Sequence, residues 1–133
     1  MRLNLFKLSN NITLQIINEL TKFRLTLSVV FSSFISYILG SELINFIDLT
    51  YLLTGGILIV SSSNIFNQII EKDLDKLMNR TKNRPLPKNK IKINTALLLA
   101  ITTGVLGIVL MYLINIKVAI LAAVSIFLYT AVY

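Results

Sequence analysis

The chain has 133 residues, of which 55% are hydrophobic, and it carries a net charge of +7 with neither cysteine nor histidine. A soluble domain of this length has too little interior to bury so much apolar surface, so the composition excludes an ordinary soluble protein and indicates an integral membrane protein. The missing residue types exclude disulfides, thiolate metal sites and a histidine general base, which leaves carboxylates, Asn, Arg, Lys and Tyr for any chemistry.

The predicted elements are all helical. In chain order, a mildly amphipathic helix over residues 10–20 is expected to lie along the membrane interface. Four nearly charge-free segments follow, at residues 23–39, 49–70, 95–114 and 118–133. A helix needs about 20 residues to cross the hydrocarbon, so the first three are predicted to span it and the fourth to be cut short. Because lipid offers no hydrogen bonds to an open backbone, the expected fold class is an all-α, polytopic transmembrane helix bundle.

The positive charge is concentrated on alternate connections between the spans. Four basic residues lie before the first span or at its start and eight lie within residues 71–92, whereas residues 40–48 carry two acidic residues and no Lys or Arg. This is the positive-inside pattern, which predicts that the N-terminus and the 71–92 loop are cytoplasmic. Orientation therefore explains the charge without a nucleic-acid partner. Since no Arg- and Ser-rich leader precedes the spans, the bacterial inner membrane is the expected location.

Arg24 stands with Lys22 at the start of the first span. The simpler interpretation is that both cations reach back to the lipid headgroups at the interface. The alternative interpretation is that Arg24 faces the bundle and binds an anionic group of a substrate.

Small residues occur within the second and third spans, at Gly55, Gly56, Gly104 and Gly107. Such residues let helix backbones approach closely in a membrane. They predict tight helix packing along both spans.

A polar constellation begins where the second span ends. Asn67, Glu71 and Asp75 are spaced four residues apart. On a helix each such step turns by about 40°, so the three project from one stripe while Asp73 points to the other side. Two carboxylates and an amide form an oxygen-rich edge, which suits a hard cation such as Mg²⁺ that shares its coordination with substrate phosphates. The three stripe residues are therefore the candidate metal-binding and catalytic residues.

Three basic residues follow the stripe and are candidates for binding a diphosphate: Arg80, Lys82 and Arg84. Arginine forks match phosphate oxygens bidentately, and lysine adds a mobile point charge. Taken alone, an acidic pair at an interface is usually a solvated face, and a basic loop is ordinary topology. The solvated interpretation does not explain Asn67 and Gln68, which lie inside the apolar segment where polar groups are costly.

Residues 67–86 read NQIIEKDLDKLMNRTKNRPL. This segment resembles the first aspartate-rich motif of the UbiA-type intramembrane prenyltransferases, whose pattern is N-x-x-x-(D/E)-x-x-x-D. Glu71 stands where the family more often has Asp, which keeps the charge and lengthens the side chain. The Met at position 78 and the Arg-Thr pair that follows make the chain most similar to the haem branch, the protohaem IX farnesyltransferases or haem O synthases. The similarity covers nearly all of residues 21–133 and is strongest over residues 64–87.

The resemblance implies a Mg²⁺-dependent transfer of a farnesyl group from farnesyl diphosphate to a vinyl group of protohaem IX, which gives haem O. By the same resemblance, Mg²⁺ would be held by Asn67, Glu71 and Asp75. The leaving diphosphate would be neutralised by Arg80, Lys82 and Arg84. Arg24 is the candidate contact for a haem propionate.

The family fold is a larger helix bundle with a second acidic motif in its second half. Residues 1–133 are therefore expected to be the N-terminal part of a UbiA-like domain. The expected partners are membrane lipid, farnesyl diphosphate, haem and the missing C-terminal half of the enzyme.

Two alternatives stay open. A prenyltransferase of the quinone or chlorophyll branch would share the fold and the motif, and fold similarity does not determine the acceptor. A non-catalytic, truncated membrane protein would also retain four spans and one motif. A transporter is disfavoured because no charge lies in the middle of a span.

Overall fold

The computed structural model describes residues 2–132, with side chains from Ser9 onward. All regular structure in that part of the chain is helical, which confirms the predicted fold class. The helices, in chain order, are α1 (Arg2–Thr21), α2 (Phe23–Gly40), α3 (Phe46–Leu77), α4 (Ile93–Ile114) and α5 (Ile116–Val132).

Three of the helices, α2, α3 and α4, are long and apolar enough to cross a membrane. The fourth predicted span corresponds to α5, which is apolar but has 17 residues. It begins at Ile116, two residues earlier than predicted, because Asn115 ends α4 and its Oδ1 accepts a hydrogen bond from the backbone N–H of Lys117 at 2.9 Å. Tyr133, the last residue of that predicted span, lies outside the described residues. The chain is an integral membrane protein.

The helix α3 is longer than the span predicted over residues 49–70, and the predicted 71–92 loop begins only at Met78. The charged residues after position 70 are good helix formers, and Lys76 and Asp73 pair along the helix with Nζ and Oδ1 3.8 Å apart. At 1.5 Å per residue a helix of 32 residues is roughly 48 Å long. The hydrocarbon is about 30 Å thick, so the charged end of α3 extends beyond it.

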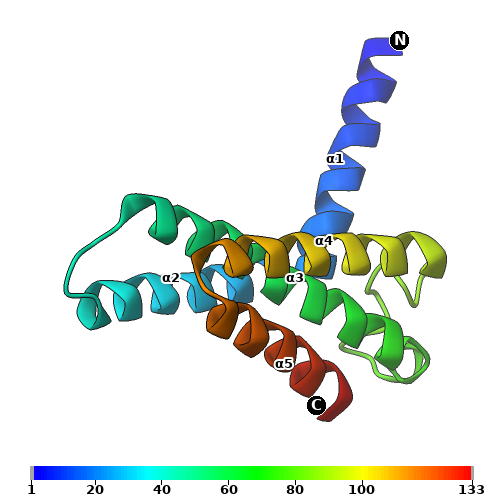
Figure 1. The fold of residues 1–133 in the computed structure, drawn as a ribbon. Coiled ribbons are helices and arrows are strands. Elements are labelled where there is room, and N and C mark those ends of the chain that lie inside the picture. The colour runs from blue at the N-terminus through cyan, green and yellow to red at the C-terminus, as the bar shows by residue number, and fades with distance from the viewer. Residues whose placement is uncertain (1, 133) are drawn as a thin grey trace.

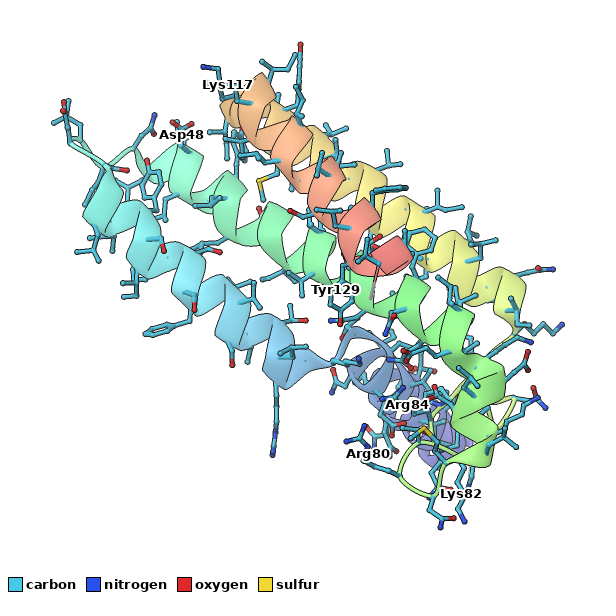
Figure 2. The ribbon with its side chains drawn as sticks, turned by 90° about the horizontal axis from the view of Figure 1, so that it is seen from below. Asp48, Arg80, Lys82, Arg84, Lys117 and Tyr129 are labelled. Atoms are coloured by element: carbon cyan, nitrogen blue, oxygen red, sulfur yellow. The ribbon has the colours of Figure 1, made fainter. Side chains whose placement is uncertain are left out.

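The helix α3 packs against both α2 and α4, and the three run in alternating directions, while α5 packs against α3 and α4 (Figure 1). This alternation brings the α1–α2 junction, the end of α3 and the following loop to one end of the bundle. Arg80, Lys82 and Arg84 lie at that end, while Asp48 and Lys117 lie at the opposite end (Figure 2). The helix α1 leaves the bundle steeply at the junction (Figure 1), and its Leu20 is fully buried against the bundle.

The tightest helix packing is between α3 and α4, as the glycines of the two spans predict. A Cβ placed on Gly107 would lie 2.9 Å from the Ile59 side chain, and one on Gly104 would lie 2.7 Å from Oγ of Ser62. Ser62 also donates a hydrogen bond of 2.7 Å to the backbone carbonyl of Ala100 on α4. Most of the large apolar side chains elsewhere are exposed. A lipid solvent accommodates such a surface, so the interior needs only small residues and a few polar pairs.

Candidate active site

The site begins at a break in the backbone between α1 and α2. Lys22 alone separates the two helices, and it has a left-handed conformation with φ 49° and ψ 59°. That conformation costs a residue with a Cβ roughly 1–2 kcal/mol, and helix ends that adopt it usually use glycine. Lys22 therefore occupies a position where local geometry favours a different residue.

Two amides of α3 hold this break. Nε2 of Gln68 donates to the carbonyls of Glu19 and Leu20 at 3.0 and 2.9 Å. Nδ2 of Asn64 donates to the carbonyl of Thr21 at 2.9 Å. These carbonyls are the ones that the last turn of a helix leaves without an intrahelical donor. The polar residues inside the apolar span therefore have a structural role as well: they cap α1 and fix where the chain turns into α2.

Tyr129 extends this network to α5. Its hydroxyl donates to Oδ1 of Asn64 at 3.2 Å, and Figure 2 shows Tyr129 turned towards α3 from the end of α5. A tyrosine near the end of a span usually marks the membrane interface. Here its hydroxyl instead joins α5 to the amide that caps α1.

The predicted stripe of α3 lines a pocket of about 300 Å³, here named the Asp75 pocket. Its residues come from the α1–α2 junction, the end of α3 and the loop that follows: Lys22, Asn67, Glu71, Leu74, Asp75, Met78, Arg80, Thr81 and Arg84. Asp73 points away from it, with 78% of its side chain exposed. The helical spacing brings the three stripe residues together as the sequence predicts.

The loop after α3 folds back over the stripe through Asp75. Nη1 of Arg84 donates to Oδ1 and Oδ2 of Asp75 at 3.1 and 3.0 Å and lies 3.7 Å from Oε2 of Glu71. Oγ1 of Thr81 donates to the backbone carbonyl of Asp75 at 3.1 Å. Pro85 follows Arg84 directly and is fully buried, which anchors the guanidinium over the carboxylates. The Arg84-Pro85 pair therefore has a structural role, which is to hold the loop against the end of α3, in addition to its predicted chemical role.

Positive charge prevails in the Asp75 pocket, since Lys22, Arg80 and Arg84 face only the two carboxylates of Glu71 and Asp75. Burial lowers the pKa of the Lys22 ammonium, and the neighbouring Arg84 guanidinium adds to this effect, while Glu71 and Asp75 act in the opposite direction. The pocket therefore has an excess of cations that only an anion can balance fully.

Two of the predicted contacts lie outside the Asp75 pocket. Lys82 is exposed at the outer side of the loop (Figure 2), where its Nζ donates to Oδ1 of Asn79 at 3.3 Å. Arg24 is also exposed and lines a separate open groove of about 750 Å³ between α1 and α2, together with Lys22 and Phe23. Lys22 is the residue shared by the groove and the Asp75 pocket.

The donor set of the pocket fits a hard cation that completes its coordination elsewhere. Among the residues that the structure describes, no three carboxylates, histidines or cysteines come together. Glu71 has a side chain that is 31% exposed, so its carboxylate is accessible to an ion. Nδ2 of Asn67 is buried with no protein partner, and as a donor it could bind an oxygen of an anion that shares the ion. Mg²⁺ typically uses one or two carboxylates and takes its other ligands from water and phosphate. The stripe residues suit that ion better than one that needs a complete protein cage.

Two apolar pockets lie along α3, the helix that carries the stripe. A pocket of about 450 Å³ between α3, α4 and α5 is lined almost entirely by hydrophobic side chains, among them Phe66, Ile70, Ile108 and Phe127. A second, of about 290 Å³, lies between α2, α3 and α5. A helix that lines both a charged pocket and apolar pockets suits a molecule with an anionic head and a long hydrocarbon tail.

Sequence reasoning missed Lys22 and Gln68 in these roles. Lys22 precedes the stripe by 45 positions or more, and no spacing rule connects residues on different helices. The signal available was a cation directly before an apolar span, and that is ordinary in membrane proteins. Gln68 was recognisable as a costly polar residue, but its partners on α1 were not.

Comparison with known proteins agrees with these features. The profile of the UbiA prenyltransferase family matches residues 29–133, which contain every residue of the Asp75 pocket except Lys22. A protein named protoheme IX farnesyltransferase from Christiangramia forsetii is 51% identical over 115 residues, which are 86% of this chain and 38% of the relative. Proteins of the same name from Flavobacterium psychrophilum and Listeria innocua are 50% and 33% identical, over 86% and 94% of this chain and 39% and 44% of the relatives.

No solved structure matches the chain. The chain spans about two fifths of the length of the curated relatives it matches. The family profile covers most of the sequence, and the matched part carries the stripe, the loop and three of the apolar helices in full. The chain belongs to the UbiA prenyltransferase family.

Proposed function

We propose that this chain forms the diphosphate-binding part of an intramembrane farnesyltransferase that makes haem O from protohaem IX. The observation that carries the proposal is the Asp75 pocket, which combines an oxygen-rich stripe with an excess of cations on a helix that also lines an apolar pocket. Farnesyl diphosphate has the matching form, a diphosphate on a long hydrocarbon chain. The name shared by the relatives supports haem as the acceptor.

Magnesium is part of the proposal. Asn67, Glu71 and Asp75 would hold the ion, and when bound it supplies positive charge to the diphosphate oxygens. Glu71 is the most accessible of the three, because both oxygens of Asp75 accept hydrogen bonds from Arg84. Arg84 then connects the metal-binding edge to the loop that closes over it.

The arginines are proposed to stabilise the leaving group. As the allylic C–O bond of farnesyl diphosphate breaks, the electron pair leaves with the diphosphate, and the charge that develops there is met by Arg80 and Arg84. Donors held in place before the reaction need no reorganisation during it, and the Asp75 carboxylate holds Arg84 in this way. Lys82 remains a predicted outer contact, since it lies outside the pocket.

The acceptor step follows from the same arrangement. A vinyl group of haem would attack the farnesyl cation, and a water molecule would then add to the resulting cation and lose a proton, giving the hydroxyethylfarnesyl product. Apolar helices keep water from quenching the farnesyl cation early. Arg24 on the groove between α1 and α2 remains the predicted contact for a haem propionate.

The proposed location is the bacterial inner membrane, with the N-terminus and the loop after α3 in the cytoplasm. The end of the bundle that carries Arg80, Lys82 and Arg84 would then face the side where the soluble diphosphate is supplied (Figure 2). The proposed partners are membrane lipid, the two substrates and the remaining part of the protein.

The test begins with the intact mass of the natural polypeptide and continues with that polypeptide in proteoliposomes. It is given farnesyl diphosphate and Mg²⁺ with either haem B or a hydroxybenzoate, and the products are identified by mass. Haem O formed only with haem B supports the proposal. Prenylated hydroxybenzoate would assign the protein to another branch, and failure to bind Mg²⁺-diphosphate would favour a non-catalytic membrane protein. Omitting Mg²⁺ tests the metal requirement, which is contradicted if turnover is unchanged in the presence of a chelator.

A further inference from the structure

Lys22 is the one residue of the Asp75 pocket that lies outside α3 and the loop after it. It reaches the pocket from the junction of α1 and α2, about fifty positions before Asp75 in the sequence. Its side chain is half-buried, and the charges of Arg84, Glu71, Asp75 and Arg80 all act on it. Lys22 therefore borders the candidate diphosphate site and feels its charges.

The backbone at Lys22 shows that this placement is maintained against local preference. A left-handed residue between two helices is the position where glycine is usually found. At this position lysine is locally less stable than glycine, because its Cβ makes the left-handed conformation costly. The strained conformation persists because Asn64 and Gln68 bind the last carbonyls of α1 and Oγ1 of Thr26 donates to the carbonyl of Thr21 at 2.8 Å.

We propose that Lys22 is a substrate-binding residue, whose ammonium contacts the diphosphate of the prenyl substrate from the side opposite the α3 stripe. This inference deepens the proposed function and rests on it. It adds an inner lysine to the outer one: Lys82 is exposed and bonded to Asn79, whereas Lys22 shares the pocket with both arginines. Burial beside Arg84 disfavours the charged ammonium, and a bound diphosphate removes that penalty.

Lys22 also lines the open groove between α1 and α2. Binding of the diphosphate by this lysine would therefore anchor the α1–α2 junction, which forms one wall of that groove. The groove is not proposed as a second binding site. Its wall would be held in place as a consequence of the Lys22 contact.

The experiment measures equilibrium binding of radiolabelled farnesyl thiodiphosphate, an analogue that resists ionisation, with Mg²⁺ to the full natural polypeptide in nanodiscs. Three variants separate charge from backbone: Lys22→Gly, Lys22→Gln and Lys22→Arg. Glycine suits φ 49° and removes the cation, glutamine removes the cation and keeps the strain, and arginine keeps both. Asn89→Gly is the matched control, since Asn89 is the other non-glycine residue with positive φ among residues 2–132 and lies outside the pocket.

The glycine and glutamine variants are expected to bind the analogue about 10- to 100-fold more weakly, the range for loss of a charge-assisted hydrogen bond. The arginine variant and Asn89→Gly should stay within about threefold of the wild type. Thermal unfolding of Lys22→Gly should be unchanged or shifted upward, because glycine relieves the strain. If the wild type binds the analogue and Lys22→Gly binds it equally well, the lysine contact is wrong while the proposed function stands. If the wild type does not bind it at all, both are overturned.

Discussion

At the scale of single residues, Asp75 has a structural role in the loop and a proposed role in the chemistry of the site. Only 4% of its side chain is exposed, its carboxylate accepts two hydrogen bonds from Arg84, and its backbone carbonyl accepts one from Thr81. The carboxylate thus positions the loop that carries the proposed diphosphate contacts. Asp73, two residues away, is exposed and pairs only with Lys72 and Lys76 among the described residues.

We expect Asp75→Asn to lower turnover of the full-length enzyme by about 100-fold or more, because it removes a metal-binding charge and weakens the hold on Arg84. The variant should still insert into the membrane. Asp73→Asn is the control, and its turnover should be within about twofold of the wild type. Steady-state haem O formation measures both. An equally inactive Asp73→Asn variant would show that the stripe is assigned to the wrong face of α3.

Arg84 offers a second test at this scale. Arg84→Lys keeps the charge but loses the planar fork that reaches Asp75 and Glu71. The affinity for the diphosphate analogue should fall by about tenfold, which is the magnitude of one charge-assisted hydrogen bond. Lys82→Gln should change it by less than about threefold, since Lys82 is exposed outside the pocket. A larger effect at Lys82 than at Arg84 would contradict the geometry described above.

At the scale of helices, the contact of α3 with α4 depends on the absence of a side chain at Gly107. A Cβ there would meet two atoms of the Ile59 side chain at 2.9 Å and the Ile59 backbone nitrogen at 3.1 Å. The backbone of Ile59 cannot move away from such a Cβ unless α3 itself shifts. The helix that carries the stripe is therefore held by small residues, as is usual between membrane helices.

Gly107→Ala should lower the free energy of unfolding by about 1–3 kcal/mol, the usual cost of overpacking. Thermal unfolding of the detergent-solubilised full-length protein measures the change. Gly56→Ala, on α3, is the control, because its Cβ would meet only Val30 at 3.9 Å. If both variants unfold at the wild-type temperature, the close approach of α3 and α4 is not present in the protein.

The junction of α1 with the bundle depends on Gln68. Gln68→Met keeps the shape but removes both hydrogen bonds to the carbonyls of Glu19 and Leu20. We expect a loss of about 1 kcal/mol in unfolding free energy, since the change also removes an Oε1 atom that is buried without a partner. Gln15→Met is the exposed control, and its unfolding temperature should not change. Proteolysis within α1 should become faster only in the Gln68 variant.

At the scale of the whole molecule, the charges divide the bundle into two unlike ends. The basic loop after α3 and the Asp75 pocket share one end, and Asp48 and Lys117 lie at the other (Figure 2). The alternating directions of α2, α3 and α4 produce this division (Figure 1). The orientation of the protein would therefore decide from which side the proposed diphosphate substrate enters.

The orientation can be tested because this chain has no cysteine. Lys88→Cys and Glu42→Cys are introduced one at a time into the full-length protein, in a background free of other cysteines. Each variant is then treated with a membrane-impermeant maleimide. In intact cells only the Glu42 position should be labelled, and in inverted vesicles only the Lys88 position. Labelling of both positions from one side would contradict the proposed topology.

Much of this organisation was predictable from the sequence. Lipid leaves the backbone no alternative to helices, so the apolar segments near residues 23, 49, 95 and 118 predict α2 to α5, with ends that differ by a few residues. The stripe of Asn67, Glu71 and Asp75 follows from helical spacing within one segment. The apolar run that ends at residue 70 marks the edge of the lipid and not the end of the helix, which the stripe extends to Asp75 and which ends at Leu77.

The sequence by itself determined which side chains belong to one helix face, since that depends only on spacing along a single element. The tertiary structure decided which faces meet. It brings Lys22 from the α1–α2 junction into the pocket, places Lys82 outside it and directs Gln68 to the end of α1. Contacts between residues far apart in the chain depend on how whole helices pack. That packing is governed by small residues and buried amides whose partners no local pattern reveals.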